Sequence, residues 1–191
     1  MVIVDVGAND GEFTKKAMET CEGAEVHAIE PNPACWPQLE RLKDRFSRLT
    51  IHRVGCDAHD GRRGLQLNPN TTKGTYVPGI EPDAHGVTET PMVRLDDLIE
   101  RADFVKIDAQ GLDAAILRGA PRLLQTCPLW VVEVWPTGLE GNGDSVEGLY
   151  QTLTDAGLQV QWMDETPCTP DEILAWRESG RVYTNWIGVR V

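Results

Sequence analysis

The stretch VIVDVGANDG, residues 2–11, decides the fold of this chain. An apolar run broken only by Asp5 is followed at once by Gly7, Asn9 and Gly11. A short β-branched run that stops at glycine is typical of a buried strand that enters a tight turn. Apolar residues then recur from residue 13 at helical spacing, so we expect a helix directly after the turn.

The same order of strand and helix continues along the chain. The further strands are expected at 26–29, 50–54, 104–107, 129–135, 158–163 and 186–191. Their alternation with amphipathic segments predicts one α/β domain over residues 1–191, with a mostly parallel sheet covered by helices on both faces. The pattern dissolves at about 59–91, where we expect an inserted loop that folds as a functional lid or mobile segment.

Composition excludes several classes of protein. The 191 residues carry a formal charge of −12, which argues against nucleic acid or an anionic membrane as a partner. The 5 cysteines form no C-x-x-C pair, so free thiols in a reducing compartment are expected rather than a disulfide or zinc scaffold. Neither a signal peptide nor a membrane-length apolar run is readable, and a cytoplasmic protein is expected.

Acidic residues lie at the ends of four of the predicted strands. They are Glu30, Asp57, Asp108 and Glu133. Ligands of open α/β sheets bind at the carboxyl ends of the strands, so these side chains and the first glycine turn are expected to share one crevice. Asn32 is predicted to be the N-cap of the helix that follows the second strand.

The first turn differs from a dinucleotide-binding fingerprint. Asn9 and Glu12 stand where G-x-G-x-x-G needs glycines, and Asp5 and Asp10 add negative charge. A pyrophosphate needs free amides without adjacent acids. S-adenosyl-L-methionine (SAM) carries a sulfonium and an ammonium and no phosphate, so it suits this turn. Glu30 would accept from the ribose hydroxyls of such a ligand.

Four segments resemble one family. VDVGANDGEFT, AIEPNP, VKIDAQGLDAAILRGA and LWVVEVW are similar to the FkbM-type methyltransferases of the class I SAM-dependent fold. The resemblance implies a Rossmann-like, seven-stranded sheet whose last strand is antiparallel. It also implies SAM as the methyl donor and a hydroxyl acceptor on a small molecule or saccharide.

The resemblance also implies which residues of this chain bind the cofactor. They are Asp5, Gly7, Ala8, Asn9, Gly11, Phe13, Glu30, Pro31, Asn32, Cys56, Asp57, Asp108 and Gln110. The glycine turn would surround the methionine part, Glu30 the ribose, and Cys56 with Asp57 the adenine. Gln110 departs from the family, which more often has an acid there. The family also usually has sequence before the first strand, so part of the cap over the acceptor is expected to be absent or to come from a homodimer or a partner subunit.

An alcohol acceptor must lose its proton on methylation, and three residues are candidates for this chemistry. Asp108 ends the fourth strand, Lys106 lies on the same face two residues earlier, and His85 lies in the 59–91 loop. Two of these residues have alternative, non-catalytic roles. Lys106 could form a salt bridge with Glu133, and His85 could be a solvated loop residue. No compact set of metal ligands is readable, so no metal ion is expected.

Two other functions stay open. An NAD-dependent oxidoreductase or epimerase has a related sheet, although this chain lacks Tyr-x-x-x-Lys. A non-catalytic scaffold subunit of the same fold is the second alternative, suggested by Gln110. Methylation of a nucleic-acid amine is disfavoured, because Asp108-Ala-Gln-Gly lacks the prolines and aromatic ring that hold an exocyclic amine.

Overall fold

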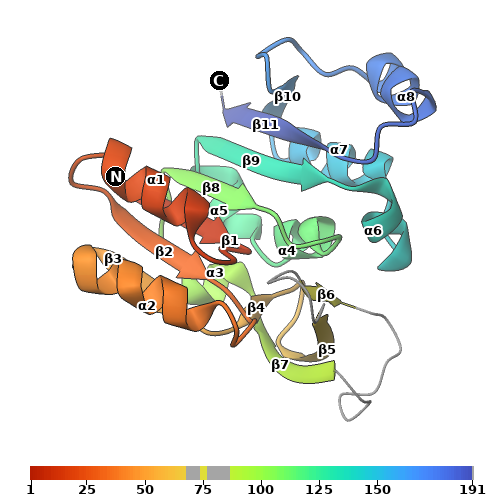
Figure 1. Cartoon of the computed structure of the whole chain (residues 1–191). Coiled ribbons are helices and arrows are strands. Elements are labelled where there is room, and N and C mark those ends of the chain that lie inside the picture. The colour runs from red at the N-terminus through yellow and green to blue at the C-terminus, as the bar shows by residue number, and fades with distance from the viewer. Residues whose placement is uncertain (68–73, 77–86, 191) are drawn as a thin grey trace.

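The computed structural model describes residues 1–67, 74–76 and 87–190, which form two sheets with helices around the larger one (Figure 1). The seven strands of the main sheet are, in spatial order, β10 (Leu158–Trp162), β11 (Thr184–Arg190), β9 (Leu129–Val134), β8 (Phe104–Ile107), β1 (Val2–Val6), β2 (Glu25–Ile29) and β3 (Leu49–His52). β1 lies inside this sheet, and all five of its residues are buried, as its apolar sequence predicts.

The directions of the strands confirm the predicted sheet. β1 runs parallel to β2 and β8, and the parallel arrangement continues to β3 and β9. β11 lies between β9 and β10 and is antiparallel to both. The register places Asp5 opposite Lys106 of β8, and Glu133 of β9 opposite Asn185 of β11. The carboxyl ends of the six parallel strands therefore meet the start of β11 at one edge.

Helices cover both faces of the main sheet (Figure 1). α1 (Glu12–Thr20) and α2 (Trp36–Arg45) pack on one face of β1, β2 and β3 through a separate apolar cluster. The larger core contains residues of the remaining six helices that the structure describes, which are α3 (Leu95–Leu98), α4 (Asp113–Arg118), α5 (Pro121–Thr126), α6 (Pro136–Gly141), α7 (Val146–Asp155) and α8 (Pro170–Glu178). α7 directly precedes β10, and α8 precedes β11.

The prediction of a loop at 59–91 is wrong for the residues of this segment that the structure describes, because they form strands. A second sheet has the order β4 (Gly55–Cys56), β7 (Val87–Val93), β5 (Gly61–Leu67) and β6 (Gly74–Tyr76). In β7 the exposed Glu89 alternates with the buried Thr90 and Met92, which is the period-two pattern of a strand with one covered face. Frequent glycine and proline obscure that pattern in the sequence.

Two boundaries near the crevice also differ from the prediction. β3 ends at His52 rather than at residue 54, so Asp57 follows β4 of the second sheet instead of the third strand of the main sheet. α2 begins at Trp36 with Cys35 at the N-cap position, and Asn32 is not its cap. Asn32 instead closes the preceding turn, where its Oδ1 accepts from the Ala34 amide at 3.0 Å.

The five cysteines are free thiols, as predicted, and four of them are buried. Among the described residues, no helix is long and apolar enough to span a membrane.

Candidate active site

The turn after β1 is built from residues with left-handed backbone. Gly7 has a φ of 80°, Asn9 of 52° and Gly11 of 86°. Gly7 is required for a second reason, because a Cβ at this position would overlap the carbonyl oxygen of Asp108. The absence of a side chain lets the end of β1 pass directly against the end of β8. The two loops therefore form one continuous wall.

Glu30 connects this turn to the end of β2. Its side chain is 6% exposed; Oε2 accepts from the Asn9 amide at 2.7 Å, and Oε1 accepts from the Asn32 amide at 2.8 Å. Burial raises the pKa of Glu30 above its ordinary value, although the two amide hydrogen bonds oppose that shift. Each carboxylate oxygen has a further lone pair, so Glu30 can also accept from two hydroxyls of a ligand.

Most of the amides in the first turn are engaged within the chain. Gly7 and Ala8 both donate to the carbonyl of Ile29, at 3.0 and 3.1 Å, and Gly11 donates to the Ala8 carbonyl at 2.9 Å. Asn9 donates to the Glu30 carboxylate. A pyrophosphate site needs several open amides that point at the ligand. These four amides are not available for that purpose, in agreement with the acidic character of the turn.

Lys106 links the first strand to the acidic end of β8. Its Nζ lies 3.3 Å from Oδ1 of Asp5 and 3.5 Å from Oδ2 of Asp108, so its ion pairs are with these residues rather than with Glu133. Asp5 is fully buried and also accepts from Thr14 Oγ1 at 2.6 Å. Burial lowers the pKa of Lys106, but the two carboxylates outweigh it, and the net pKa is raised. Lys106 is therefore a fixed cation at neutral pH.

Gln110 joins the ends of β8 and β9. Its Nε2 lies 3.3 Å from Oδ1 of Asp108 and 3.3 Å from Oε2 of Glu133, and it donates to both. Burial, and then the charges of Asp108 and Asp113, raise the pKa of Glu133 to about 8. The sequence placed Glu133 in the expected crevice, as the single charged residue of the apolar run that forms β9, but gave it no catalytic or cofactor-binding role.

The turn that carries Gln110 is held by Asp113. This fully buried carboxylate accepts from the Ala109 amide at 3.1 Å and from the Gly111 amide at 3.0 Å. Burial raises the pKa of Asp113 to about 6. Gly111 has a φ of 98° and packs against Gly138 of α6, where a Cβ would overlap the backbone. The position of Gln110 is thus fixed by its backbone neighbours.

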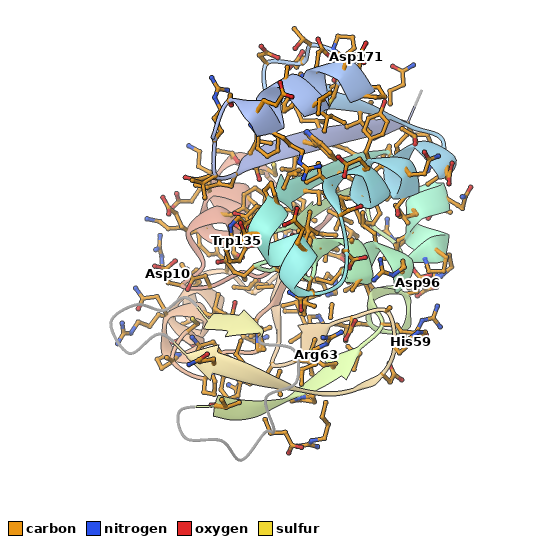
Figure 2. The ribbon with its side chains drawn as sticks, turned by 90° about the vertical axis from the view of Figure 1, so that its right-hand side faces the viewer. Asp10, His59, Arg63, Asp96, Trp135 and Asp171 are labelled. Carbon is orange, nitrogen blue, oxygen red and sulfur yellow. The ribbon has the colours of Figure 1, made fainter. Side chains whose placement is uncertain are left out.

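These loops enclose a cavity of about 470 Å³ at the carboxyl edge of the main sheet. Figure 2 views the molecule from this side, with Trp135 labelled above the second sheet that carries Arg63. Eight of the predicted cofactor-binding residues line the cavity: Gly7, Asn9, Glu30, Pro31, Asn32, Cys56, Asp108 and Gln110. The volume is in the range of small-molecule and cofactor sites.

The other predicted residues lie around the cavity rather than on its wall. Asp5 and Lys106 form the buried pair beneath it, and Phe13 lies under the Lys106 ammonium, 5.5 Å from Nζ to the ring centroid. Asp57 is held by Arg63 Nε at 2.5 Å and by the Ala58 amide. Ala8 is buried beside the turn, and Gly11 faces α2. His85 lies outside the described residues.

The wall also contains residues that sequence reasoning missed. Trp135 follows β9, and Val182, Tyr183 and Asn185 come from the segment that enters β11. Because β11 is antiparallel, its first residues reach the edge where the parallel strands end. No local pattern in the sequence signals that placement. Within the described ranges, no group of three or more His, Cys, Asp or Glu side chains is placed to hold a metal ion.

The strand order, the antiparallel β11 and the carboxylate-lined cavity at the strand ends define a class I SAM-dependent methyltransferase fold. The family profile described as Methyltransferase FkbM domain matches residues 5–160, and this chain belongs to that family. Its cofactor is SAM, as predicted. The residues present fit that cofactor, because Glu30 has acceptor capacity directed at the cavity and the turn amides are closed to phosphate.

The chain is similar to two curated methyltransferases. It is 28% identical over 139 residues to the hexuronic acid methyltransferase AglP of Haloferax volcanii, in a match that covers 70% of this chain and 55% of the relative. It is 25% identical over 211 residues to methyltransferase sdnD of Sordaria araneosa, covering 89% of this chain and 78% of the relative. The chain therefore spans little more than half of the first relative's length.

The fold is also that of a solved structure with the cofactor in place. Fibrillarin of Aeropyrum pernix, in complex with natively bound SAM, superposes with a TM-score of 0.51 and 15% sequence identity. The superposition covers 98% of this chain and 65% of fibrillarin. At this level of identity the likeness concerns the fold.

Proposed function

We propose that this chain transfers the methyl group of SAM to a hydroxyl oxygen of a small molecule, with a saccharide as the acceptor class. One observation carries the proposal: a single cavity has Glu30 at one end and the hydrogen-bonded group Asp108, Gln110 and Glu133 at the other. The name of the relative AglP, a hexuronic acid methyltransferase, supports a saccharide.

The strand order supports an assignment of the two ends. Neighbouring strands are about 4.8 Å apart, and β2, β1, β8, β9 and β11 are consecutive. Glu30 after β2 would hold the ribose, and Gly7 and Asn9 after β1 would hold the methionine part. Cys56 and the nearby Asp57 would flank the adenine. The ends of β8 and β9 and the start of β11 then remain for the acceptor.

The acceptor end has the side chains that a sugar hydroxyl needs. Asp108 and Glu133 accept hydrogen bonds when ionised, and Gln110 has a carbonyl oxygen besides its engaged amide group. Trp135 and Tyr183 add flat apolar surface against which a sugar ring can pack. When bound, SAM supplies a methyl group that is already activated by the sulfonium. The protein then has to align the acceptor hydroxyl with that methyl group and to accept the hydroxyl proton.

Asp108 and Glu133 are the proposed proton acceptors. Both line the cavity, and the raised pKa of Glu133 lies near the pH at which a base operates best. Lys106 stays protonated in its ion pairs, so we assign it the positioning of Asp108 rather than proton removal. His85 stays a prediction, since it lies outside the described residues.

Two measurements test this proposal in sequence. Thermal unfolding with SAM, S-adenosylhomocysteine and NAD is expected to show stabilisation by the first two alone, by about 2.7 kcal/mol at a hundredfold excess over Kd. Release of S-adenosylhomocysteine is then measured with a panel of hydroxyl compounds. Stabilisation by SAM without methylation of any hydroxyl compound would favour a non-catalytic scaffold subunit over an enzyme. Stabilisation by neither SAM nor S-adenosylhomocysteine would reject the proposed function.

A further inference from the structure

The acceptor end of the cavity has an unusual charge balance. Its described lining contains the carboxyl groups of Asp108 and Glu133, with Glu30 at the far end, and no Lys, Arg or His among the described residues. A carboxylate or phosphate that enters a half-closed cavity loses hydration and needs a cation or several N–H donors in exchange. The described wall provides no cation for that exchange.

The nearest cations are already committed to carboxylates of this chain. Lys106 is 17% exposed and lies between Asp5 and Asp108. Arg63 on β5 donates to Asp57 at 2.5 Å. Neither side chain lines the cavity. Recruiting either one to a substrate anion would break an ion pair that is partly or fully buried, which is strongly unfavourable.

The backbone donors at this end are committed as well. The turn after β8 leads into α4, and its amides at Ala109 and Gly111 both donate to the buried carboxylate of Asp113. The amide hydrogens of Gln110 donate to Asp108 and Glu133. Asp113 therefore occupies, from inside the protein, the donors that an anionic substituent would otherwise use.

We infer that the acceptor is a saccharide without an anionic group, either neutral or amino-substituted, and that this site rejects uronic acids. The inference rests on the proposed function and narrows its substrate class. It separates this chain from its relative AglP, whose name specifies a hexuronic acid. A neutral hydroxyl compound satisfies the Asp108 carboxylate and the free carbonyl of Gln110 as acceptors, and an ammonium group would pair with the Asp108 carboxylate.

Three matched glycosides test the inference: methyl glucoside, methyl glucosaminide and methyl glucuronide, which differ in one substituent. Binding to the full chain with S-adenosylhomocysteine is measured by ligand-observed NMR, and methyl transfer is measured in parallel with SAM. We expect the glucoside and the glucosaminide to bind at least about tenfold more tightly than the glucuronide. Equal or tighter binding of the glucuronide overturns the inference. Binding of none of the three also overturns it, because the saccharide class would then be wrong.

A charge variant at the rim gives an independent check. Tyr183 lines the cavity and is 63% exposed, so its replacement places little strain on the fold. Tyr183→Arg introduces a cation, and we expect it to reduce the ratio of glucoside affinity to glucuronide affinity by about tenfold. The neutral control Tyr183→Gln should leave this ratio unchanged. An unchanged preference in Tyr183→Arg would show that charge does not set the selectivity. Thermal stabilisation by SAM, recorded on each variant, separates failure of this inference from failure of the proposed function.

Discussion

Lys106 and Asp5 form an ion pair between neighbouring parallel strands, with Nζ 3.3 Å from Oδ1 and the Asp5 side chain fully buried. Both residues occupy the same level of β8 and β1. Through the second contact of Lys106, the pair also fixes Asp108 at the edge of the cavity. The fold and the site therefore depend on the same buried charges.

Removal of the Lys106 ammonium is expected to be costly. Lys106→Met leaves Asp5 with Thr14 as its remaining side-chain partner, and breaking a buried pair in this way costs about 3–5 kcal/mol of unfolding free energy. Urea unfolding measures the loss. Lys16→Met, at an exposed position of α1, is the control and should change little. A loss below about 1 kcal/mol in Lys106→Met would refute the structural role of the pair.

A methyl group at Gly7 should disturb the cofactor site. Gly7→Ala places a Cβ on the Asp108 carbonyl in a left-handed conformation, so the ends of β1 and β8 must separate. We expect the variant to lose more than about 1 kcal/mol of unfolding free energy. We also expect its affinity for SAM, measured by isothermal titration calorimetry, to fall by about tenfold or more. Gly61→Ala is matched to it, because nothing lies within 4 Å of that added Cβ. Similar affinities for both variants would contradict the close approach of the two strands.

The charge of Glu30 should determine SAM affinity. Glu30→Gln keeps the shape but weakens the hydrogen bonds that a charged acceptor offers to two hydroxyls, and we expect affinity to fall by about ten- to a hundredfold. Isothermal titration with SAM measures the change. Glu12→Gln alters an exposed acid beside the same turn and should shift affinity by less than about threefold. Unaltered affinity in Glu30→Gln would remove Glu30 from the ribose site.

The proton on Glu133 should make stability depend on pH. Its pKa rises from the ordinary 4.5 to about 8 on folding, so the folded chain retains a proton that the unfolded chain releases between these values. Stability from this group is therefore present below about pH 4.5 and decreases as the pH rises toward 8. Glu133→Gln should lack this component, so its Tm relative to the native chain increases from pH 5 to 8. A constant difference in Tm would contradict the raised pKa.

The same proton should be visible in turnover. If Glu133 takes the acceptor proton, kcat/KM rises as the pH passes through about 8 and levels off above it. Glu133→Gln is expected to lose this step and most of the activity, while SAM still stabilises the variant in thermal unfolding. A pH profile that keeps the same step in Glu133→Gln would assign it to another group, with Asp108→Asn as the next variant to examine.

The sequence predicted the cavity wall at the ends of β1 and β2 better than the wall at β9 and β11. Glu30 and the turn after β1 lie where the local pattern indicated, because a strand, a glycine turn and a helix are contiguous in the chain. Asp57 shows the limit of that reasoning. Its position depends on where the chain leaves the main sheet for β4, and the pairing of β4 with β7 joins residues far apart in the sequence.

The sequence by itself determined the alternation of strands and helices, the family and the edge of the sheet at which the glycine turn and the acidic side chains lie, since apolar periodicity and turn residues act over a few neighbours. Only the tertiary structure decided which side chains line the cavity at the ends of β8 and β9. Gln110 meets Glu133 because β8 and β9 are adjacent, and Tyr183 reaches the cavity because β11 enters the sheet antiparallel. These contacts arise from the packing of distant segments, and no short stretch of sequence specifies them.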